Sequence, residues 1–393
     1  MAMKKAYMDY GAGTLVDPRV LEAMKPYFTE VFGNPSSVHS LGQEAKRAME
    51  ESRKNVADFV GAETKEEIIF TSGATESNNL AIKGVAYRNR NRGNHIITTT
   101  IEHMSVINTF KYLQKEGFKT TYVTVDKYGI VDAEALRNAI TDQTILVSVM
   151  YANGEIGTVE PIKEIGEIAH EKNICFHVDA VAAAGQVPID VINEHIDLLS
   201  LSSNDFYGPK GVGALYIKTG TKIQPIIHGG GQERGLRSGT ENVPAVVGMG
   251  EAAKISKREM ESESVRLSEL RDRLIDGVLD RIPHSFLNGH PTKRLPNNAN
   301  LRFGYIEGES LILSLDMEGV ATSSGSACTS KTLEPSHVLL AIGLAHEEAH
   351  GSLVFTLGRW TTKDQIDYVL KILPGIVRRL RAISPLTPKE LLR

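Results

Sequence analysis

The sequence predicts an α/β protein with a mostly parallel sheet, and two observations support this expectation. Strand-like and helix-like segments alternate from about residue 65 to about residue 220, and this alternation is typical of parallel sheets. Several strand segments are continuous apolar or β-branched runs, as expected for strands covered on both faces. The seven expected strands are IIFTS (68–72), HIITTT (95–100), TTYVTV (120–125), TILVSVMY (144–151), ICFHVD (174–179), DLLSLSS (197–203) and GALYIK (213–218).

The stretches between these strands have helical spacing. Ile162, Ile165 and Ile168 fall on one face, with charged residues such as Glu164 opposite. Pro161 suits the first turn of this helix, where its missing N–H costs nothing.

A second, smaller α/β domain is expected after the large one. The pattern changes near residue 255, where a long charged amphipathic helix begins. A short strand over 298–303 and a helix over 363–384 follow it, and the N-terminal arm is expected to join them. The expected domains are residues 15–255 for the large one, and residues 1–14 with 256–393 for the small one.

Composition predicts an ordinary globular protein of the cytoplasm. Of 393 residues, 41% are hydrophobic and 23% are charged, and the net charge of -4 indicates neither nucleic acid nor an anionic membrane as a partner. Only two cysteines occur, which argues against a disulfide framework. We find no signal-peptide pattern and no apolar run as long as the roughly 20 residues of a membrane span.

The segment FTSGATESNNLAI (70–82) is a strand, a glycine turn and a helix start. Gly73, Ala74 and Thr75 would present backbone N–H groups and a hydroxyl at a helix N-terminus, which favours a phosphate. A merely capped helix is the alternative. The segment contains neither a Walker loop nor a dinucleotide-binding fingerprint.

Two titratable residues follow strand ends, where an α/β sheet opens its cleft. His103 could stack on a flat cofactor ring and shuttle protons, or it could be a structural histidine. Asp179 ends an apolar strand, so its carboxylate needs a cation or several donors. A protonated pyridine nitrogen is one such partner, and a helix cap or a salt bridge is the alternative.

Two loops also carry chemistry. The glycine-rich segment 229–243 contains Arg234, Arg237 and Thr240. It suits contact with an anion and could reach into a neighbouring subunit. A Ser/Gly-rich loop holds Cys328, whose thiol would be reactive if its pKa is lowered. Cys175 lies inside an apolar strand, where a structural role is expected.

These motifs, in this order and spacing, resemble the cysteine desulfurases of iron–sulfur cluster assembly. The resemblance runs nearly end to end, from MDYGAGTLVDPRV and FGNPSSVHSLGQ through TSGATESNNLAIKG and GGGQERGLRSGT to EGESLILSLDMEGVATSSGSACTS. It implies a pyridoxal-phosphate-dependent transferase of the aspartate-aminotransferase-like fold type I. It also implies a homodimer with its active site at the subunit interface.

The resemblance assigns roles to matched residues. In this family a lysine holds pyridoxal phosphate as a Schiff base, L-cysteine is the substrate, and a loop cysteine takes the sulfur as a persulfide, leaving alanine. His103 matches the residue stacked on the ring, Asp179 the partner of the ring nitrogen, and Cys328 the persulfide carrier, with an iron–sulfur scaffold protein as sulfur acceptor. The further implied cofactor contacts are Ala74, Thr75, Asn153, Ser202 and, from the neighbouring subunit, Thr240.

Five positions depart from the family pattern. Asp205 stands at the lysine position and Asn204 at the histidine before it. Gly154 replaces the second asparagine of NNEIG, and Ala182 replaces a glutamine expected to hydrogen-bond the cofactor's phenolic oxygen. Val354 aligns with the arginine that grips the substrate carboxylate.

A Schiff-base enzyme needs an amine nucleophile, and a carboxylate cannot supply one. Lys210 is no obvious substitute, because the family has a lysine in YGPKG as well as the catalytic one. Asp205 also adds a second negative charge near Asp179, which should raise the pKa of one of the pair. We therefore expect weak or absent binding of pyridoxal phosphate and low or absent desulfurase turnover.

Two rival hypotheses stay open. In one, the chain is a silent partner or scaffold, and Cys328 carries sulfur from another source or ligates an iron–sulfur cluster on a bound scaffold protein, because thiolates suit such clusters. In the other, Asp205 and His103 catalyse a reaction that needs no pyridoxal phosphate.

Overall fold

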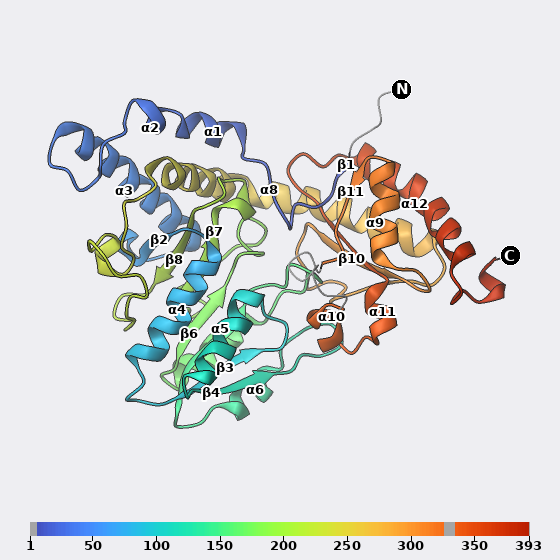
Figure 1. Cartoon of the computed structure of the whole chain (residues 1–393), viewed down its shortest axis with the longest axis horizontal. Coiled ribbons are helices and arrows are strands. Elements are labelled where there is room, and N and C mark those ends of the chain that lie inside the picture. Colours follow the sequence, from blue (N-terminus) through green and yellow to red (C-terminus); the bar gives the residue numbers. More distant parts are fainter. Residues whose placement is uncertain (1–5, 326–334, 393) are drawn as a thin grey trace.

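A computed structural model describes residues 6–325 and 335–392 of the chain. Figure 1 shows a larger body built around a seven-stranded sheet and a smaller body, with the long helix α8 running from one to the other. In the described part of the chain, none of the helices has both the length and the apolar content needed to cross a bilayer.

The strands are β1 (Ala6–Tyr7), β2 (Ile68–Thr71), β3 (His95–Thr99), β4 (Lys119–Val123), β5 (Thr144–Met150), β6 (Cys175–Asp179), β7 (Leu198–Ser202), β8 (Gly213–Ile217), β9 (Ser285–Leu287), β10 (Asn298–Phe303), β11 (Val320–Ala321) and β12 (Ser352–Thr356). The α-helices are α1 (Pro18–Met24), α2 (Pro26–Thr29), α3 (Ser40–Val60), α4 (Ala74–Arg88), α5 (Met104–Lys115), α6 (Ala133–Ala139), α7 (Ile162–Glu171), α8 (Val243–Arg281), α9 (Gly308–Met317), α10 (His337–Ala341), α11 (His346–His350) and α12 (Lys363–Ile383). Short 3₁₀ turns are η1 (Lys65–Glu67), η2 (Ser203–Phe206), η3 (Glu233–Gly235) and η4 (Lys389–Leu392).

The large sheet has the strand order β2-β8-β7-β6-β5-β3-β4, which confirms the predicted seven strands. The pairs among β7, β6, β5, β3 and β4 are parallel, whereas β8 runs antiparallel to both of its neighbours. Because the parallel strands end at the same edge, the segments that follow β3, β6 and β7 meet there.

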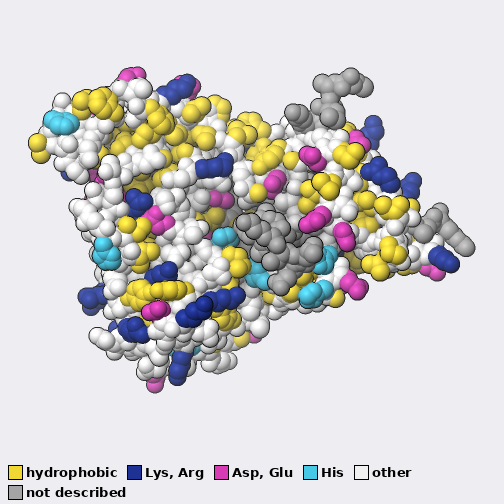
Figure 2. All heavy atoms as spheres, viewed as in Figure 1, with side chains coloured by type: hydrophobic (Ala, Val, Ile, Leu, Met, Phe, Trp, Pro, Cys, Tyr) yellow, Lys and Arg dark blue, Asp and Glu magenta, His cyan; other side chains and the backbone are white. Residues whose placement is uncertain are grey.

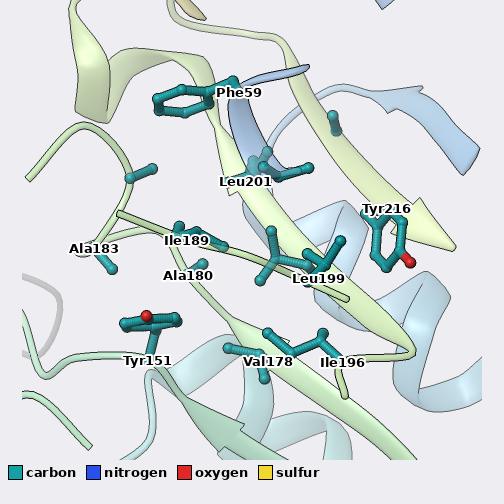
Figure 3. Close-up of a cluster of buried hydrophobic side chains, with 14 of the residues drawn as sticks. Phe59, Tyr151, Val178, Ala180, Ala183, Ile189, Ile196, Leu199, Leu201 and Tyr216 are labelled. Carbon is teal, nitrogen blue, oxygen red and sulfur yellow. The ribbon is translucent and has the colours of Figure 1, made fainter. Parts of the chain in front are cut away.

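Apolar side chains fill the space on both faces of this sheet. Figure 3 shows Leu199 and Leu201 of β7 packed with Val178 of β6 and Ile196, all of them fully buried. This burial explains the continuous apolar runs in the sequence, since both faces of these strands are covered.

The smaller body is organised around β10. Strands β9 and β12 flank it on either side in antiparallel pairing, and α9, α12 and the second half of α8 pack against this sheet. The N-terminal strand β1 pairs in parallel with β11, so the N-terminal arm joins this body as expected.

Helix α8 differs from its predicted extent. It begins at Val243, twelve residues before the charged stretch, because its first turns are apolar and pack against α3. Gly250 lies so close to α3 that a Cβ there would stand 2.5 Å from Ser52. The helix crosses residues 255 and 256 without a break, and the predicted domain boundary stays a prediction. Helix α7 also differs slightly, since Pro161 precedes its first residue rather than lying in its first turn.

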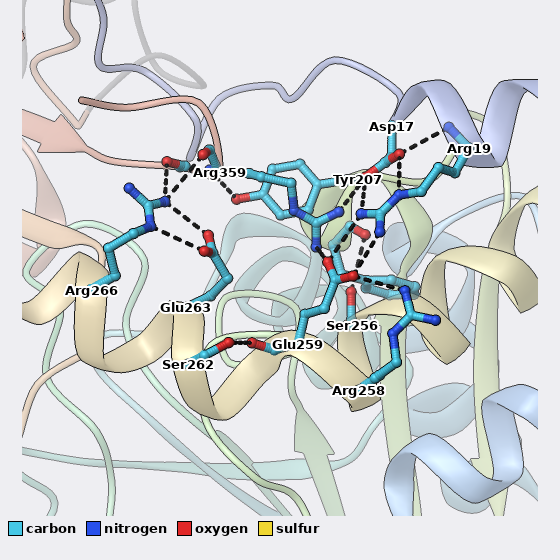
Figure 4. A network of polar contacts seen from close by, with 12 residues as sticks. Asp17, Arg19, Tyr207, Ser256, Arg258, Glu259, Ser262, Glu263, Arg266 and Arg359 are labelled. Carbon is cyan, nitrogen blue, oxygen red and sulfur yellow. Dashed lines mark hydrogen bonds and ion pairs between the residues drawn. The ribbon is translucent and has the colours of Figure 1, made fainter.

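An ion-pair network ties the two bodies together (Figure 4). Asp17, at the start of α1, accepts from Arg19 at 2.8 Å and forms an ion pair with Arg359, which follows β12. Glu259 of α8 pairs with the same two guanidinium groups, at 2.6 Å to Arg19 and 3.3 Å to Arg359. The phenol ring of Tyr207 lies beneath the Arg359 guanidinium, 4.7 Å from its centre.

We predict that Asp17→Asn lowers the free energy of unfolding by about 2 kcal/mol near pH 7. The substitution leaves Arg19 and Arg359 with only the Glu259 carboxylate as a shared ion-pair partner among the described residues. The hydrogen bond from Arg19, with the charge of Arg359, lowers the pKa of Asp17 to about 2. A carboxylate whose pKa falls on folding stabilises the native state above its ordinary pKa and loses that effect on acidification. The difference from the wild type should therefore shrink below about pH 4 and vanish only below about pH 2, as measured by urea denaturation at each pH.

The matched control is Asp58→Asn, which removes an exposed pair with Lys54 on α3 and should change stability by less than about 0.5 kcal/mol. A difference between Asp17→Asn and wild type that stays constant down to pH 3 would contradict the assignment.

Candidate active site

The edge of the sheet where the parallel strands end holds the predicted site residues. Three segments converge there: the turn that opens α4, the end of β6, and the 3₁₀ turn η2 that follows β7. Helix α4 packs against β6, β7 and β8, which places its first turn beside the other two segments.

The start of α4 offers free backbone donors. The first hydrogen bond within the helix runs from Ser77 N to Gly73 O, so the amides of Ala74 and Thr75 are left for other acceptors. Gly73 has a φ of 150° and nothing stands within 4 Å of where its Cβ would be. Because aligned peptide dipoles add to these free amides, this end of α4 suits an anion.

Glycine at the start of β8 brings the turn η2 to this helix end. A Cβ on Gly213 would stand 2.7 Å from the Cα of Gly73, so no larger residue fits without moving the backbone. Gly213 is the partner of Ser202 in the antiparallel pair of β7 and β8. Ser202, the last residue of β7, therefore lies beside the first turn of α4.

A chain of hydrogen bonds connects Asp179 with His103. Asp179 is almost completely buried and accepts from Asn78 Nδ2 of α4 at 2.7 Å and from Val181 N at 3.1 Å. Asn78 also donates to Ser105 Oγ at 2.8 Å, and Ser105 Oγ contacts His103 Nδ1 at 2.8 Å.

This chain also orients the imidazole. Ser105 N donates to His103 Nδ1 at 3.1 Å, so Nδ1 acts as an acceptor and Nε2 carries the proton in the neutral ring. His103 is exposed at the N-terminus of α5, with its ring fixed from behind. Sequence reasoning named His103 and Asp179 but missed Asn78 and Ser105; their only signals are that Asn78 lies inside the segment 70–82 and that Ser105 follows His103 by two residues.

Asp205 lies in η2, partly buried, and shares this region with Asp179. The pKa of Asp205 is raised to about 7, mainly by burial and in smaller part by the negative charge of Asp179, while a hydrogen bond with the Ser202 side chain opposes the rise. The expected rise in the pKa of one of the two carboxyl groups is therefore found at Asp205.

Asn204 and Lys210 both contact the N-terminal arm. Asn204 O accepts from Thr14 Oγ1 at 2.5 Å, and Thr14 N donates to Asn204 Oδ1 at 3.3 Å. Lys210 Nζ donates to Thr14 O at 2.9 Å. The N-terminal arm thus holds both residues, and Lys210 is directed to that arm.

Gly154, Ala182 and Val354 are the three other positions at which we expect a departure from the family pattern. Gly154 and Ala182 are neighbours, since a Cβ on Gly154 would stand 3.4 Å from that of Ala182. Val354 is buried in β12, where its backbone pairs with Ser323. All three positions have small or apolar groups, whereas the family resemblance led us to expect asparagine, glutamine and arginine there.

Asn153 is buried and its side chain binds only backbone and one sulfur. It donates to Ile101 O at 3.0 Å and accepts from Glu155 N and Ile156 N at 2.9 and 3.0 Å, with Met150 Sδ also in contact. These bonds support the turn after β5 and the segment that leads to His103.

The loop after β8 is tied to the start of α4. Arg237 Nε donates to Glu76 Oε1 at 2.8 Å, and Glu76 also accepts from Ser72 N at 2.9 Å. Farther along the same loop, Thr240 is exposed. The buried ion pair between Arg53 of α3 and Glu233 of this loop also holds the loop in place, through two hydrogen bonds of 2.7 Å.

Cys328 lies outside the described residues. The chain on either side of this gap is held near residue 155: a Cβ on Gly325 would stand 2.6 Å from Glu155 Cγ, and Ser336 Oγ donates to Glu155 Oε2 at 2.7 Å. Among the described residues, no group of three or more His, Cys, Asp or Glu side chains could hold a metal ion. Cys175 starts β6, and burial raises the pKa of its thiol well above the usual value, which fits the expected structural role.

Comparisons with known proteins agree with this architecture. A family model for class-V aminotransferases matches residues 6–369. The chain is 58% identical over 380 residues to cysteine desulfurase IscS 1 of Archaeoglobus fulgidus, covering 97% of this chain and 99% of that protein.

Two solved structures extend the comparison to three dimensions. A NifS-like protein is 40% identical with a TM-score of 0.90, covering 96% of this chain and 100% of that one. SspA in complex with cysteine is 38% identical with a TM-score of 0.80, covering 91% and 100%. The chain therefore belongs to the class-V aminotransferases, among the cysteine desulfurases of the IscS type, and has the pyridoxal-phosphate-dependent fold type I of that family.

Proposed function

We propose that this protein is a cysteine desulfurase homologue of iron–sulfur cluster assembly whose own desulfurase turnover is low or absent, because Asp205 stands where the family binds the cofactor aldehyde. The observation that carries the proposal is the carboxylate of Asp205 beside Asp179, with Lys210 held by the N-terminal arm. L-cysteine as the family substrate rests on the relatives' names and on the solved relative that holds cysteine.

The site fits two of the three groups by which pyridoxal phosphate is bound, namely its phosphate and its ring nitrogen, but not its aldehyde. The free amides of Ala74 and Thr75, with Ser202 beside them, suit its phosphate, and buried Asp179 suits its ring nitrogen. His103, fixed by Ser105, is placed to stack on the ring. The aldehyde end does not fit, because bound pyridoxal phosphate needs a lysine amine there.

The substrate side of the site is altered as well. Gly154 and Ala182 supply no hydrogen bond of the kind that asparagine and glutamine make, and Val354 supplies no cation for a substrate carboxylate. Several losses at one site explain low turnover better than the loss of a single contact. We assign Thr240 to the phosphate site of a second copy, since it lies on an exposed loop.

A homodimer is part of the proposal, and an apolar surface around α1 and α2 supports it. Phe28, Phe32 and Val38 are 61%, 67% and 93% exposed, and Figure 2 shows hydrophobic side chains gathered over α1, α2 and the start of α3. An apolar patch of this kind is unusual on a monomer and favours a covered interface. A second copy of the chain is the occupant that the family resemblance implies.

The sulfur chemistry of Cys328 stays a hypothesis. As a persulfide carrier it would deliver sulfur to an iron–sulfur scaffold protein, and as a thiolate it could ligate a cluster on that protein.

We predict that the purified protein shows no visible absorbance of lysine-bound pyridoxal after addition of pyridoxal phosphate, and forms little or no alanine from L-cysteine. Asp205→Lys should restore the covalent adduct, because it supplies the missing amine. Turnover should rise further when Gly154→Asn, Ala182→Gln and Val354→Arg are added. Absorption spectra and alanine assays of the single and combined variants check both expectations.

Borohydride reduction and peptide mapping provide the control for a different attachment point. A pyridoxyl adduct on Lys210 or any other lysine of the wild type, accompanied by alanine formation equal to that of the repaired variant, would refute the proposal.

We predict that Phe32→Asp weakens dimerisation by about 10-fold or more, since a buried charge replaces apolar contact. Leu313→Asp is the matched control, because Leu313 of α9 is equally exposed at 67% but lies on the small body. Sedimentation equilibrium measures both variants. Equal dimer dissociation constants for Phe32→Asp and wild type would place the interface elsewhere.

A further inference from the structure

The region around Asp205 and Asp179 has more negative than positive charge. Within residues 6–325 and 335–392, no lysine, arginine or histidine forms an ion pair with either carboxylate. Two cations of the surrounding segments have other partners: Lys210 binds Thr14 O, and Arg237 pairs with Glu76. A ligand that occupies this region is therefore favoured if it brings positive charge.

A buried acceptor without a partner supports the same conclusion. Asn78 is fully buried, its amide nitrogen is bound to Asp179 and Ser105, and its Oδ1 has no hydrogen-bond partner among the described atoms. A buried acceptor without a donor costs free energy, and its partial negative charge adds to the electronegative surroundings of Asp179. Two carboxylates and an amide oxygen thus all favour donors.

The opposite preference holds at the start of α4. There, free amides and the helix dipole favour an anion, within reach of Ser202. The site is bipolar, with an anion end at α4 and a cation end at Asp179 and Asp205. A ligand that matches it carries a phosphate and two cationic nitrogens.

We propose that this site selects pyridoxamine 5′-phosphate, the amine form of the family cofactor, over pyridoxal 5′-phosphate, and that Asp205 binds its ammonium group. The inference rests on the proposed function, which assigns the phosphate to α4 and the ring nitrogen to Asp179. The exchange of lysine for aspartate inverts the charge at the cofactor's reactive carbon. The amine is therefore carried by the ligand and not by the protein, and it pairs with the Asp205 carboxylate without a covalent bond.

The position where the family resemblance implies a cation for a substrate carboxylate is Val354, which disfavours a cofactor already joined to an amino acid. Such a ligand would add a carboxylate, and the buried apolar side chain of Val354 offers it no cation. The amine form adds no such charge.

The test compares ligands that differ at one group. Calorimetric titration of the full-length wild-type dimer would use pyridoxamine 5′-phosphate, pyridoxine 5′-phosphate, pyridoxal 5′-phosphate and inorganic phosphate. The first two differ only in carrying an ammonium or a hydroxyl group. We expect the amine to bind about 10-fold or more tightly than the alcohol, as a charge-assisted hydrogen bond in a partly buried site provides. The aldehyde should bind no more tightly than the alcohol.

Variants identify the carboxylate responsible. Asp205→Asn should abolish the preference for the amine over the alcohol, whereas Asp142→Asn, an exposed aspartate at the opposite edge of the sheet, should leave it unchanged. Asp205→Lys should reverse the preference in favour of the aldehyde. Thermal melting confirms that each variant is folded, and the ligand series on wild type needs no variant.

Equal affinity of the wild type for the three pyridine ligands would overturn the inference, as would no binding, binding no tighter than that of phosphate, or a preference that survives Asp205→Asn. These outcomes leave the proposed function intact. Pyridoxal trapped on a lysine of the wild type, together with alanine formation equal to that of the repaired variant, would instead refute the proposed function, so the two failures are distinguishable.

Discussion

The site depends on a close approach between two backbones. Gly213 at the start of β8 lies against Gly73 at the start of α4, and a side chain at position 213 would collide with that backbone. Since β8 pairs with β7, this contact sets how near Ser202 and the turn η2 lie to the free amides of α4. Asp205, which follows in η2, is thereby placed in the same small region as an anion-binding helix end and a buried aspartate.

Asn78 is the second element of this arrangement. It belongs to α4, yet its amide reaches Asp179 at the end of β6 and Ser105 at the start of α5. One side chain thus joins the N-terminal end of α4 directly to Asp179 and, through Ser105, to His103. These are the two residues that we expect to contact a cofactor ring. Because Ser105 binds His103 Nδ1 and is itself held by Asn78, the orientation of His103 depends on this chain.

The N-terminal arm holds the turn η2 from the other side. Its strand β1 pairs with β11 of the small body, Thr14 binds Asn204, and Asp17 joins Arg359 and Arg19. The arm therefore connects both bodies to the turn that carries Asp205. It also binds Lys210, the lysine closest in sequence to Asp205, so this lysine is directed to the arm and forms no ion pair with Asp205. The proposed low or absent desulfurase turnover and the proposed preference for an amine ligand both follow from the Asp205 carboxylate, which has no cationic partner among the described residues.

The sequence by itself determined the class of fold, the seven strands of the large sheet and the motifs of the site, because burial on both faces and helix-start chemistry leave local patterns. It also showed the aspartate at position 205. It did not show where α8 begins, since the apolar, glycine-containing first turns resemble core rather than the charged helix that follows. Only the tertiary structure decided that Asn78 reaches Asp179, 101 residues away, and that Lys210 is held by Thr14, 196 residues away. It also showed that Gly154 and Ala182 are neighbours. Such contacts join side chains that the fold brings together across the sheet edge, and no periodicity within one segment records them.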